Sequence, residues 1–362
     1  MAKILILANN DVGLYKFRKE LIQELLRRGN EIYISLPNGA LVPPLIEMGC
    51  KFIDTKIDRR GINPITDMKL LNKYFKILSS IKPDKVITYT IKPGIYGGLI
   101  CRVMKVPYFV NITGLGTALQ REGYLRRIIL LLYQISCKKA RIVFFENEEN
   151  RRFFIRNKLV AKEKTCKLTG AGVNLEEYEF CEYPENDKEL RFLFIGRIMK
   201  EKGIEELFEV AKRINKEHNN VFFDIVGQVE EDYKNTFEAL ESQGNINLYG
   251  YQLDIKPFIK KAHCFVLPSY HEGMANTLLE CGAMGRPLIT SNIPGCKEAV
   301  INEVSGYLVN AKDSYDLYNK IIQFIYLPYE EKAAMGWSSR KHIEKIFDKK
   351  KVIRITVNKL GI

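Results

Sequence analysis

Hydrophobic and polar positions follow one repeating pattern along this chain. Short apolar runs alternate with longer stretches in which apolar residues recur at helical spacing, which is typical of alternating strands and helices. In the first half we predict strands at 3–8, 31–36, 51–54, 85–89, 108–111 and 142–145. Such alternation predicts a parallel, doubly wound sheet, which binds ligands at the carboxyl ends of its strands.

The pattern restarts after a break near residues 170–188. A glycine-rich crossing at 169–174 precedes a polar, acidic segment with a proline, and new strands are predicted at 191–195, 221–226, 246–249, 263–267, 288–291 and 306–309. We therefore predict two domains of this α/β class, 1–172 and 173–344.

Two acidic residues stand out in the second half, within AHCFVLPSYHEGMANTLLECGAMGRP at 262–287. A strand there ends at Pro268, and a helix is predicted over 276–284. Glu272 in the loop and Glu280 in the helix are eight positions apart, about two helical turns, so both carboxylates can face one cleft. Glycine and alanine at the start of the helix leave its first N–H groups open to an anion such as phosphate.

A second strand-to-helix turn carries two cations. The strand at 191–195 is followed by GRIMKEKG, which places Arg197 and Lys202 where they can neutralise a pyrophosphate. Phosphate groups beside a pair of carboxylates indicate a sugar nucleotide as the ligand.

GRIMKEKG followed by PSYHEGMANTLLECGAMGRP resembles the retaining glycosyltransferases of family 4. That resemblance implies the GT-B fold class: two facing Rossmann-like, doubly wound parallel-sheet domains with a cleft between them. The first domain would bind the acceptor and the second the nucleotide sugar. It also implies that the closing segment, about 345–362, packs back on the first domain.

The resemblance assigns roles to the charged residues. Arg197 and Lys202 would hold the diphosphate and stabilise the leaving charge, Glu280 would accept hydrogen bonds from the ribose, and Glu272 would hold hydroxyl groups of the donor sugar. The backbone beside them would meet the distal phosphate and the sugar, and the residues concerned are Gly273, Met274, Ala275 and Asn276. Most relatives have proline or valine at the position of Ala275.

Tyr251 is the candidate for contact with the base, because the loop after the strand at 246–249 is where the family seats it. A packed loop aromatic is the alternative interpretation. In the first domain, Gly13 follows the first strand in a predicted loop, and the resemblance implies that backbone there approaches the donor.

The acceptor side is marked by YTIKPGIYGG (89–98) and NITGLGTA (111–118), which resemble a bacterial subgroup that builds capsule, O-antigen or glycan-donor oligosaccharides on lipid carriers. Lys92 is a candidate for an acceptor phosphate, or else an ordinary exposed lysine. Many family members have a histidine after the strand that we end at residue 111. This chain has Asn111 and Thr113 there, so both are acceptor candidates.

Chemistry of this type needs no cofactor. In the family, the departing phosphate itself takes the acceptor proton, and the enzyme supplies position and charge. A nucleophilic attack by Glu272 is the alternative route to retention. Because no D-x-D sequence occurs, the metal clamp of the other common transferase architecture has no ligands, and we expect metal independence.

Charge is unevenly distributed. The net charge is +13, and residues 1–150 hold 24 basic against 13 acidic side chains. Within residues 1–150, the segment 121–141 (REGYLRRIILLLYQISCKKAR) has basic residues on both sides of an apolar run. We predict that Arg121–Arg141 lies on an anionic membrane surface, with a buried helix whose ends are solvated as the alternative. Few aromatic residues are interleaved for stacking, so nucleic acid is not the expected partner.

The remaining composition indicates the compartment. Eight cysteines without a C-x-x-C pair are typical of buried thiols in a reducing compartment, and four scattered histidines form no metal pattern. The apolar run at 3–8 is too short for an export signal, and no run reaches the roughly 20 residues of a transmembrane helix. We expect a cytoplasmic protein, peripheral on the inner face of the plasma membrane.

These observations predict a retaining glycosyltransferase. It would move a hexose or N-acetylhexosamine, of GalNAc type, from a UDP-sugar to a lipid-diphosphate-linked saccharide in bacterial surface glycan synthesis. The alternatives are a transferase using another sugar nucleotide on a soluble acceptor, a GT-B sugar-nucleotide epimerase, and a non-catalytic nucleotide-sugar-binding subunit. An epimerase needs acid and base groups on both faces of the sugar, which the sequence does not reveal.

Overall fold

The structure, a computed structural model, describes residues 1–58, 61, 63–116, 119, 123–185, 188–230, 233 and 244–362. The chain divides into two compact units, Met1–Ala171 with Lys350–Ile362 (unit 1) and Gly172–Lys349 (unit 2). We placed the domain boundary after residue 172 and the returning segment at about 345, so the two divisions differ by one residue and by about five.

Unit 1 contains a parallel sheet of seven strands in the order β3-β2-β1-β4-β5-β6-β7. The strands are β1 (Lys3–Leu7), β2 (Glu31–Leu36), β3 (Lys51–Asp54), β4 (Lys85–Tyr89), β5 (Tyr108–Ile112), β6 (Ile142–Phe145) and β7 (Thr165–Lys167). The helices are α1 (Asp11–Arg27), α2 (Val42–Glu47), α3 (Pro64–Ile81), the π-helix η1 (Pro93–Gly97), α4 (Gly98–Val103), α6 (Tyr124–Cys137), α7 (Glu148–Arg156), the 3-10 turn η2 (Lys162–Lys164) and α14 (Lys349–Leu360).

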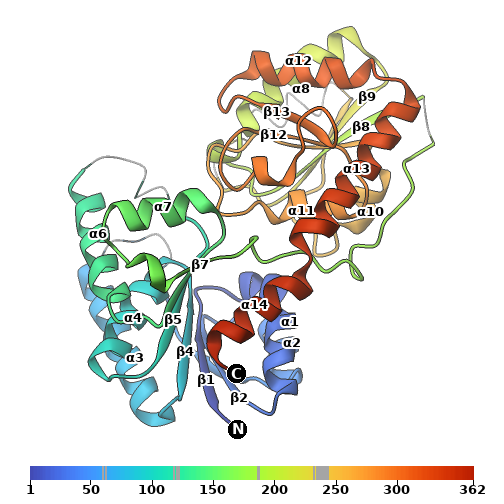
Figure 1. Cartoon of the computed structure of the whole chain (residues 1–362). Coiled ribbons are helices and arrows are strands. Elements are labelled where there is room, and N and C mark those ends of the chain that lie inside the picture. The colour runs from blue at the N-terminus through green and yellow to red at the C-terminus, as the bar shows by residue number, and fades with distance from the viewer. Residues whose placement is uncertain are drawn as a thin grey trace. The chain divides into compact units, whose positions relative to one another are not determined.

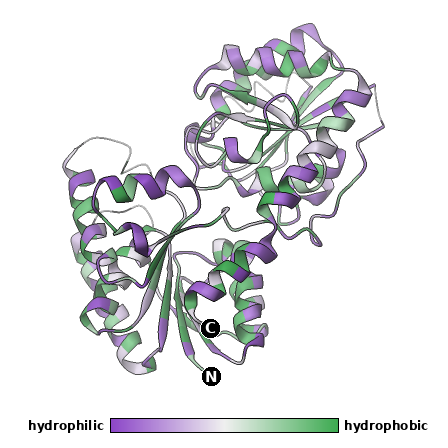
Figure 2. Cartoon of the chain, viewed as in Figure 1, coloured by the Kyte–Doolittle hydropathy of each residue, from purple (hydrophilic) through white to green (hydrophobic). Residues whose placement is uncertain are grey.

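Helices cover both faces of this sheet. In Figure 1, α3, α4 and α6 lie on one side of the strands, and α1, α2 and α14 lie on the other. Each face has its own apolar cluster, one joining α3, α4 and α6 to the strands and one joining α1, α2 and α14 to them. Because both faces are buried, the central strands are largely apolar, and much of their length is green in Figure 2.

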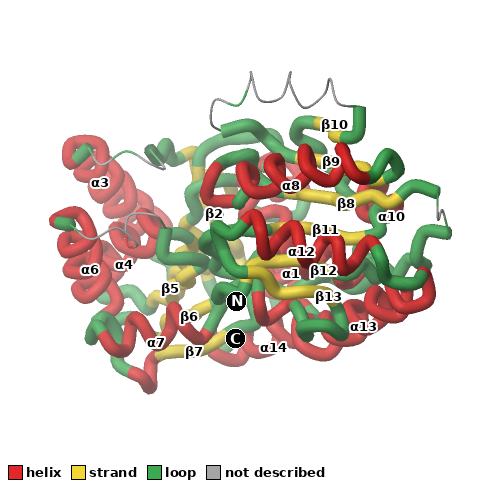
Figure 3. Tube along the Cα trace, turned by 90° about the horizontal axis from the view of Figure 1, so that it is seen from above, coloured by secondary structure: helices red, strands yellow, loops and turns green. Residues whose placement is uncertain are grey.

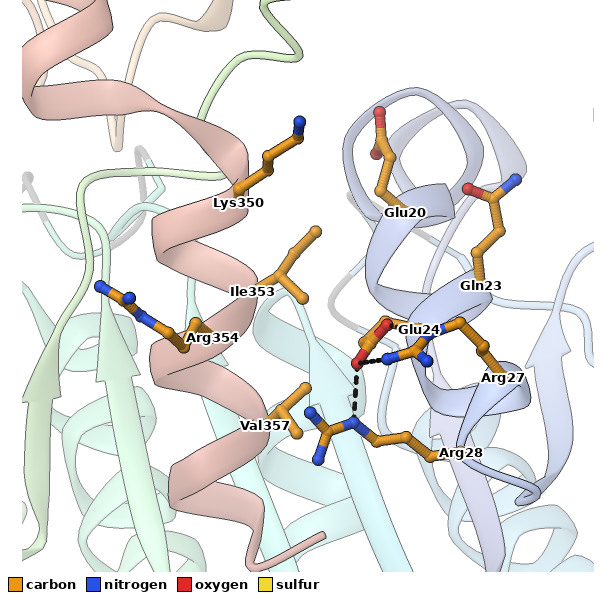
Figure 4. Close-up of a pocket in the computed structure, with 9 residues that line it drawn as sticks. All are labelled: Glu20, Gln23, Glu24, Arg27, Arg28, Lys350, Ile353, Arg354 and Val357. Atoms are coloured by element: carbon orange, nitrogen blue, oxygen red, sulfur yellow. Dashed lines mark hydrogen bonds and ion pairs between the residues drawn. The ribbon is translucent and has the colours of Figure 1, made fainter.

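The closing helix α14 returns to unit 1 beside α1. Val352, Val357 and Leu360 are buried in the same cluster as Leu21 and Leu25 of α1. Above this contact the two helices border a surface hollow of about 380 Å³ (Figure 4). Glu24 lies at its edge and pairs with Arg27 and Arg28 at 2.8 and 2.7 Å. Those two arginines lower the pKa of Glu24 to about 2.

Unit 2 contains a parallel sheet of six strands in the order β10-β9-β8-β11-β12-β13. The strands are β8 (Leu190–Ile195), β9 (Val221–Val226), β10 (Ile246–Leu248), β11 (Cys264–Leu267), β12 (Leu288–Ser291) and β13 (Gly306–Val309). The helices are the 3-10 turn η3 (Lys200–Lys202), α8 (Ile204–Glu217), α10 (Lys256–Lys261), α11 (Asn276–Ala283), the 3-10 turn η4 (Lys297–Ala299), α12 (Ser314–Ile325) and α13 (Tyr329–Phe347).

Both sheets reverse their strand order beside their first strand. β1 lies between β2 and β4, and β8 lies between β9 and β11. At such a switch point the loops on the carboxyl side diverge, and the crevice between them is where doubly wound sheets bind ligands. The loops after β8 and β11, and those after β1 and β4, are therefore the places where function is expected.

The predicted strands correspond closely to those observed, with one omission. Seven of the strands have the predicted bounds, among them β2, β4 and β12. The sequence analysis missed β7, because Thr165–Lys167 is a three-residue edge strand without an apolar run. All eight cysteines are unpaired, as predicted, and six of them are buried.

Candidate active site

Two loops meet at the switch point of unit 2, and one glycine makes this possible. Gly203, after η3, has a φ of +70°, and a Cβ there would overlap the carbonyl oxygen of Pro268 at the end of β11. The two loops are also joined by a hydrogen bond from the Tyr270 amide to the Glu201 carbonyl, at 2.9 Å. The turn after β8 is thus held directly against the loop after β11.

This junction brings Lys202 and Glu272 together. The Lys202 ammonium donates to Glu272 Oε1 in a short ion pair, and both side chains are largely buried, at 17 and 11% exposed. Ser269 Oγ donates to the same carboxylate oxygen at 2.9 Å. The cation and the acid for which the sequence predicted separate roles therefore form one fixed unit. These two donors occupy the acceptor positions of Oε1, which leaves Oε2 as the oxygen of Glu272 that could accept from a sugar hydroxyl.

Arg197 lies in the same turn after β8 and has a more open setting. Its guanidinium pairs with Glu230 Oε2 at 3.0 Å, and its side chain is 47% exposed. An exposed ion pair of this kind contributes about 1 kcal/mol or less, so it opposes the capture of a more highly charged diphosphate only weakly.

The start of α11 offers part of the predicted anion cradle. Asn276 is its first residue, and Asn276 Oδ1 is buried without a hydrogen-bond partner. The Ala275 amide, however, donates to the Gly295 carbonyl at 2.9 Å, which corrects our prediction that this amide faces the phosphate. The Ala275 amide is therefore bonded to the loop after β12. Gly295, with a φ of +84°, lets the backbone of this loop approach the carbonyl of Gly273. The predictions for Gly273, Met274 and Asn276 remain predictions.

Glu280, one turn further along α11, is buried. The residue is 8% exposed and lies near Tyr178: burial and, next, the charge of Glu280 raise the pKa of that phenol. Nothing in the spacing of the sequence connects residue 178 with residue 280, so this proximity was not predicted.

Tyr251 lies in the loop after β10, at the far edge of the sheet, and is 53% exposed. The alternative of a packed aromatic fits its neighbour Tyr249, whose ring lies 4.8 Å from Phe258. Contact between Tyr251 and the base stays a prediction.

In unit 1, Gly13 does not lie in a loop as predicted. It is the third residue of α1, and its amide donates to the side chain of Asn10, the N-cap, at 2.5 Å. Asparagine at an N-cap satisfies a free helix amide, which is why the helix begins at Asp11. A Cβ at Gly13 would lie 2.9 Å from Asn10 Oδ1, so this glycine makes room for the cap.

The acceptor candidates have structural partners. Lys92 pairs with Asp67 of α3 at 2.7 Å, and Tyr96 donates to the other oxygen of that carboxylate. Asn111 lies inside β5, which continues to Ile112, and its side chain donates to the Thr88 carbonyl at 3.2 Å. The predicted end of this strand was thus wrong by one residue, because Asn111 satisfies its polar group within the sheet. Thr113 follows the strand and is half-buried.

One residue that the sequence did not indicate is conspicuous at the unit 1 switch point. Thr90, directly after β4, has a φ of +73°, and its hydroxyl is buried without a hydrogen-bond partner. A β-branched residue in this conformation costs about 1–2 kcal/mol, and such strain concentrates at functional sites. Backbone strain leaves no mark in a single sequence.

Comparison with known proteins identifies the family. Residues 176–342 match the family described as glycosyl transferases group 1, and residues 3–147 match the family described as glycosyl transferase 4-like. An N,N'-diacetylbacillosaminyl-diphospho-undecaprenol alpha-1,3-N-acetylgalactosaminyltransferase of Campylobacter jejuni is 30% identical over 88% of each chain. The chain belongs to glycosyltransferase family 4. This confirms the resemblance predicted from the two motifs.

A further relative and two solved structures also resemble this glycosyltransferase. A UDP-Gal:alpha-D-GlcNAc-diphosphoundecaprenol alpha-1,3-galactosyltransferase of Escherichia coli is 30% identical over 80% of each chain. Among solved structures, Anabaena HepE in complex with UDP and glucose has a TM-score of 0.81 at 15% identity over the whole of both chains. A sucrose-phosphate synthase of Thermosynechococcus elongatus has a TM-score of 0.80 at 17% identity, over 99% of this chain and 98% of its own. The GT-B fold class is thereby confirmed.

The described residues contain neither a membrane-spanning helix nor a cluster of metal-ligating side chains. None of the helices there is long and apolar enough to cross a membrane. Within the same ranges, no group of three or more His, Cys, Asp and Glu side chains is placed to hold a metal ion.

Proposed function

We propose that this glycosyltransferase moves a hexose or an N-acetylhexosamine of GalNAc type from a UDP-sugar to a saccharide linked through diphosphate to a lipid, in the synthesis of bacterial surface glycans. The observation that carries the proposal is the Lys202–Glu272 pair at the unit 2 switch point, beside the start of α11. The names of the Campylobacter and Escherichia relatives support this donor and acceptor class.

We propose a retaining reaction in which the residues hold and stabilise the reactants. The bond between the anomeric carbon and the diphosphate oxygen breaks, and a bond to the acceptor oxygen forms on the same face. The acceptor proton goes to the departing diphosphate. Lys202 and Arg197 would stabilise the charge that develops on that group, and Glu272 would orient the sugar.

The test is a panel of sugar nucleotides assayed by nucleotide release, with an undecaprenyl-diphosphate-linked amino sugar as acceptor. We expect UDP release from UDP-N-acetylgalactosamine or a related UDP-hexose, only with the lipid-linked acceptor present. Release from another nucleotide with a soluble sugar, interconversion of the donor without transfer, or binding without turnover would each replace the proposal by one of its alternatives.

We also propose that the transfer needs no metal ion. Lys202 and Arg197 supply positive charge at the place where a metal would otherwise do so. Turnover is therefore expected to be unchanged after dialysis against EDTA. A loss of activity that Mg²⁺ or Mn²⁺ restores would contradict this.

Replacing Glu280 by glutamine is expected to weaken UDP binding about tenfold. An amide lacks the charge that strengthens hydrogen bonds from the ribose hydroxyls, and hydrogen bonds to charged groups contribute about 1.5–3 kcal/mol. Calorimetric titration of the full chain with UDP measures this. Unchanged affinity would show that Glu280 does not hold the ribose.

The acceptor class implies a membrane surface, which we propose as the partner of α6. Residues 121 and 122 of the predicted segment lie outside the described residues, and α6 covers Tyr124–Cys137 of the rest. Tyr124, Leu131 and Ile128 are 79, 54 and 37% exposed, so α6 carries exposed apolar side chains beside the face that packs on the core. The neighbouring α3, on the same side of the sheet in Figures 1 and 3, exposes Ile65, Met68 and Phe75. Such a surface suits peripheral binding at the inner face of the plasma membrane.

Replacing Ile128 and Leu131 together by asparagine is expected to weaken binding to vesicles that contain anionic lipid by at least about tenfold. Each buried aliphatic side chain contributes about 1.5–3 kcal/mol. Flotation with liposomes measures the change, and Ile46→Asn on α2, which is also exposed but lies on the other face of the sheet, is the control. Equal binding by both variants would favour a purely structural α6.

A further inference from the structure

A hollow of about 610 Å³ lies in the surface of unit 1, beside the carboxyl end of β3. The segment after β3 and the first half of α3 form its walls, and its charged residues are Asp54, Lys56, Asp58, Asp67, Lys69 and Lys73. The carboxyl ends of the strands are where a doubly wound sheet binds its ligands. The hollow therefore lies at the ligand-binding edge of unit 1.

The three aspartates of this hollow are already bonded to donors within unit 1. Asp67 accepts at both carboxylate oxygens, from Lys92 Nζ at one and from the Tyr96 hydroxyl at the other, each at 2.7 Å. Lys92 and Tyr96 lie about one turn apart at the start of η1, which is why both reach the same side chain. Backbone amides donate to Asp54 and Asp58, at 3.2 and 2.8 Å. Lys92 also offsets the charge of Asp67.

The three lysines of the hollow have no such partners. Among the residues that the structure describes, none forms a hydrogen bond or an ion pair with Lys56, Lys69 or Lys73. Lys69 and Lys73 are four residues apart on α3, so their like charges lie side by side, which destabilises a helix. Because Lys92 offsets Asp67, three unpaired cations face two carboxylates that are already bonded. The hollow therefore has an excess of positive charge and offers donors to an anion.

Exposed apolar side chains adjoin these cations on α3. Ile65 and Met68 are each 66% exposed, and Phe75 is 47% exposed. Ile65 and Met68 lie in the first turns of the helix, among the residues that line the hollow. A soluble anion needs no apolar surface beside its site, whereas a phosphate that is attached to a lipid brings apolar chain with it. Cations next to exposed apolar side chains thus favour a lipid-linked phosphate as the ligand.

We propose that Lys56, Lys69 and Lys73 bind the diphosphate of the lipid-linked acceptor in this hollow. The inference rests on the proposed function, in which the acceptor is linked through diphosphate to a lipid. Ammonium groups are compact donors that suit phosphate oxygens, and three of them can share the charge of a diphosphate. The headgroup of an anionic phospholipid has the same phosphate chemistry, and the experiment separates these two sources.

Calorimetric titration of the full chain with geranyl diphosphate tests the hollow, with UDP at saturation so that the donor site is filled. The wild type should bind geranyl diphosphate. Replacing Lys69 and Lys73 together by glutamine should weaken this binding at least about tenfold, because two hydrogen bonds between charged groups are lost. Geraniol, which lacks the diphosphate, should not distinguish the two proteins.

Lys73→Gln and Lys76→Gln form the matched pair of single variants. Each removes one charge from the exposed surface of α3, but Lys76 does not line the hollow. Lys76→Gln should change the affinity for geranyl diphosphate less than about twofold, because Lys76 donates no hydrogen bond to the ligand and salt screens its charge. Equal losses in the two variants would show that only the overall charge of α3 matters, and would overturn the inference.

Kinetics with the undecaprenyl-diphosphate-linked amino sugar give a second readout. The double variant should raise KM for this acceptor at least about tenfold, while kcat and KM for the donor change less than about twofold. The KM of the wild type for the acceptor should rise with ionic strength, and that of the double variant should rise less steeply.

Equal affinity of the wild type and the double variant for geranyl diphosphate overturns the inference. Weaker flotation of the double variant with phosphatidylglycerol vesicles, with KM for the acceptor unchanged, also overturns it, since the ligand would then be a phospholipid headgroup. If the wild type transfers to no lipid-linked acceptor, the proposed function fails, and the titration with geranyl diphosphate alone decides whether the hollow binds a lipid diphosphate.

Discussion

Replacing Lys202 by alanine is expected to lower kcat by about 10²–10³-fold. In the proposed reaction the diphosphate gains negative charge as it departs, and a fixed cation nearby stabilises that charge more in the transition state than in the ground state. Lys202 is fixed by Gly203, which holds its turn against the end of β11, and by its ion pair with Glu272. Steady-state rates of UDP release measure the effect.

Lys200 provides the matched control. It lies in the same 3-10 turn, is 60% exposed, and pairs with Glu205 at 2.9 Å on the surface. Lys200→Ala should change kcat less than twofold, because an exposed pair is worth about 1 kcal/mol or less. Equal losses in both variants would mean that the turn matters only as a scaffold.

A second effect of Lys202→Ala must be separated from the first. The substitution leaves the carboxylate of Glu272 largely buried without its cation, which destabilises the fold. Adding Glu272→Gln removes that charge, so the double variant should regain stability toward urea while kcat stays low. If kcat recovers together with stability, Lys202 acts by supporting the fold and the diphosphate assignment is wrong.

The donor side of this glycosyltransferase could be predicted well because its residues lie close together in sequence. Glu272 and Glu280 share one loop and helix, and Arg197 and Lys202 share one turn, so short motifs carry their relation. The strands around them could be predicted equally well, since strands buried on both faces of a sheet form near-continuous apolar runs. What the motifs did not show is that Lys202 and Glu272 bond to each other, which depends on the neighbouring positions of β8 and β11.

The contacts that escaped prediction are made by side chains far apart in sequence. Arg286 donates to the carbonyls of Cys181 and Glu182, and Arg18 pairs with the buried Glu146 from another part of unit 1, at 2.6 Å. Gly13 was misplaced for a different reason: Asn10 acts as an N-cap, and a polar stretch before a helix was taken for loop. The acceptor side was harder still, because Lys92 and Asn111 satisfy their polar groups within unit 1.

Arg286 is expected to be the most important single side chain for the stability of unit 2. It has no exposed surface, and burial lowers its pKa. Five carbonyl oxygens accept hydrogen bonds from it, those of Cys181, Glu182, Ile259, Lys260 and Gly285. A buried carbonyl that loses its partner costs about 1–3 kcal/mol, and here several would lose theirs at once.

Arg286→Met should therefore lower the free energy of unfolding by about 4 kcal/mol or more, since methionine fills the space but donates no hydrogen bond. Urea unfolding followed by Trp337 fluorescence reports unit 2 directly, because that ring lies in α13 and packs on Phe180. Arg213→Met is the control: Arg213 is 52% exposed and stacks on Tyr318, so its loss should cost about 1 kcal/mol or less. A similar small cost for Arg286→Met would mean that water replaces the guanidinium as the donor to these carbonyls.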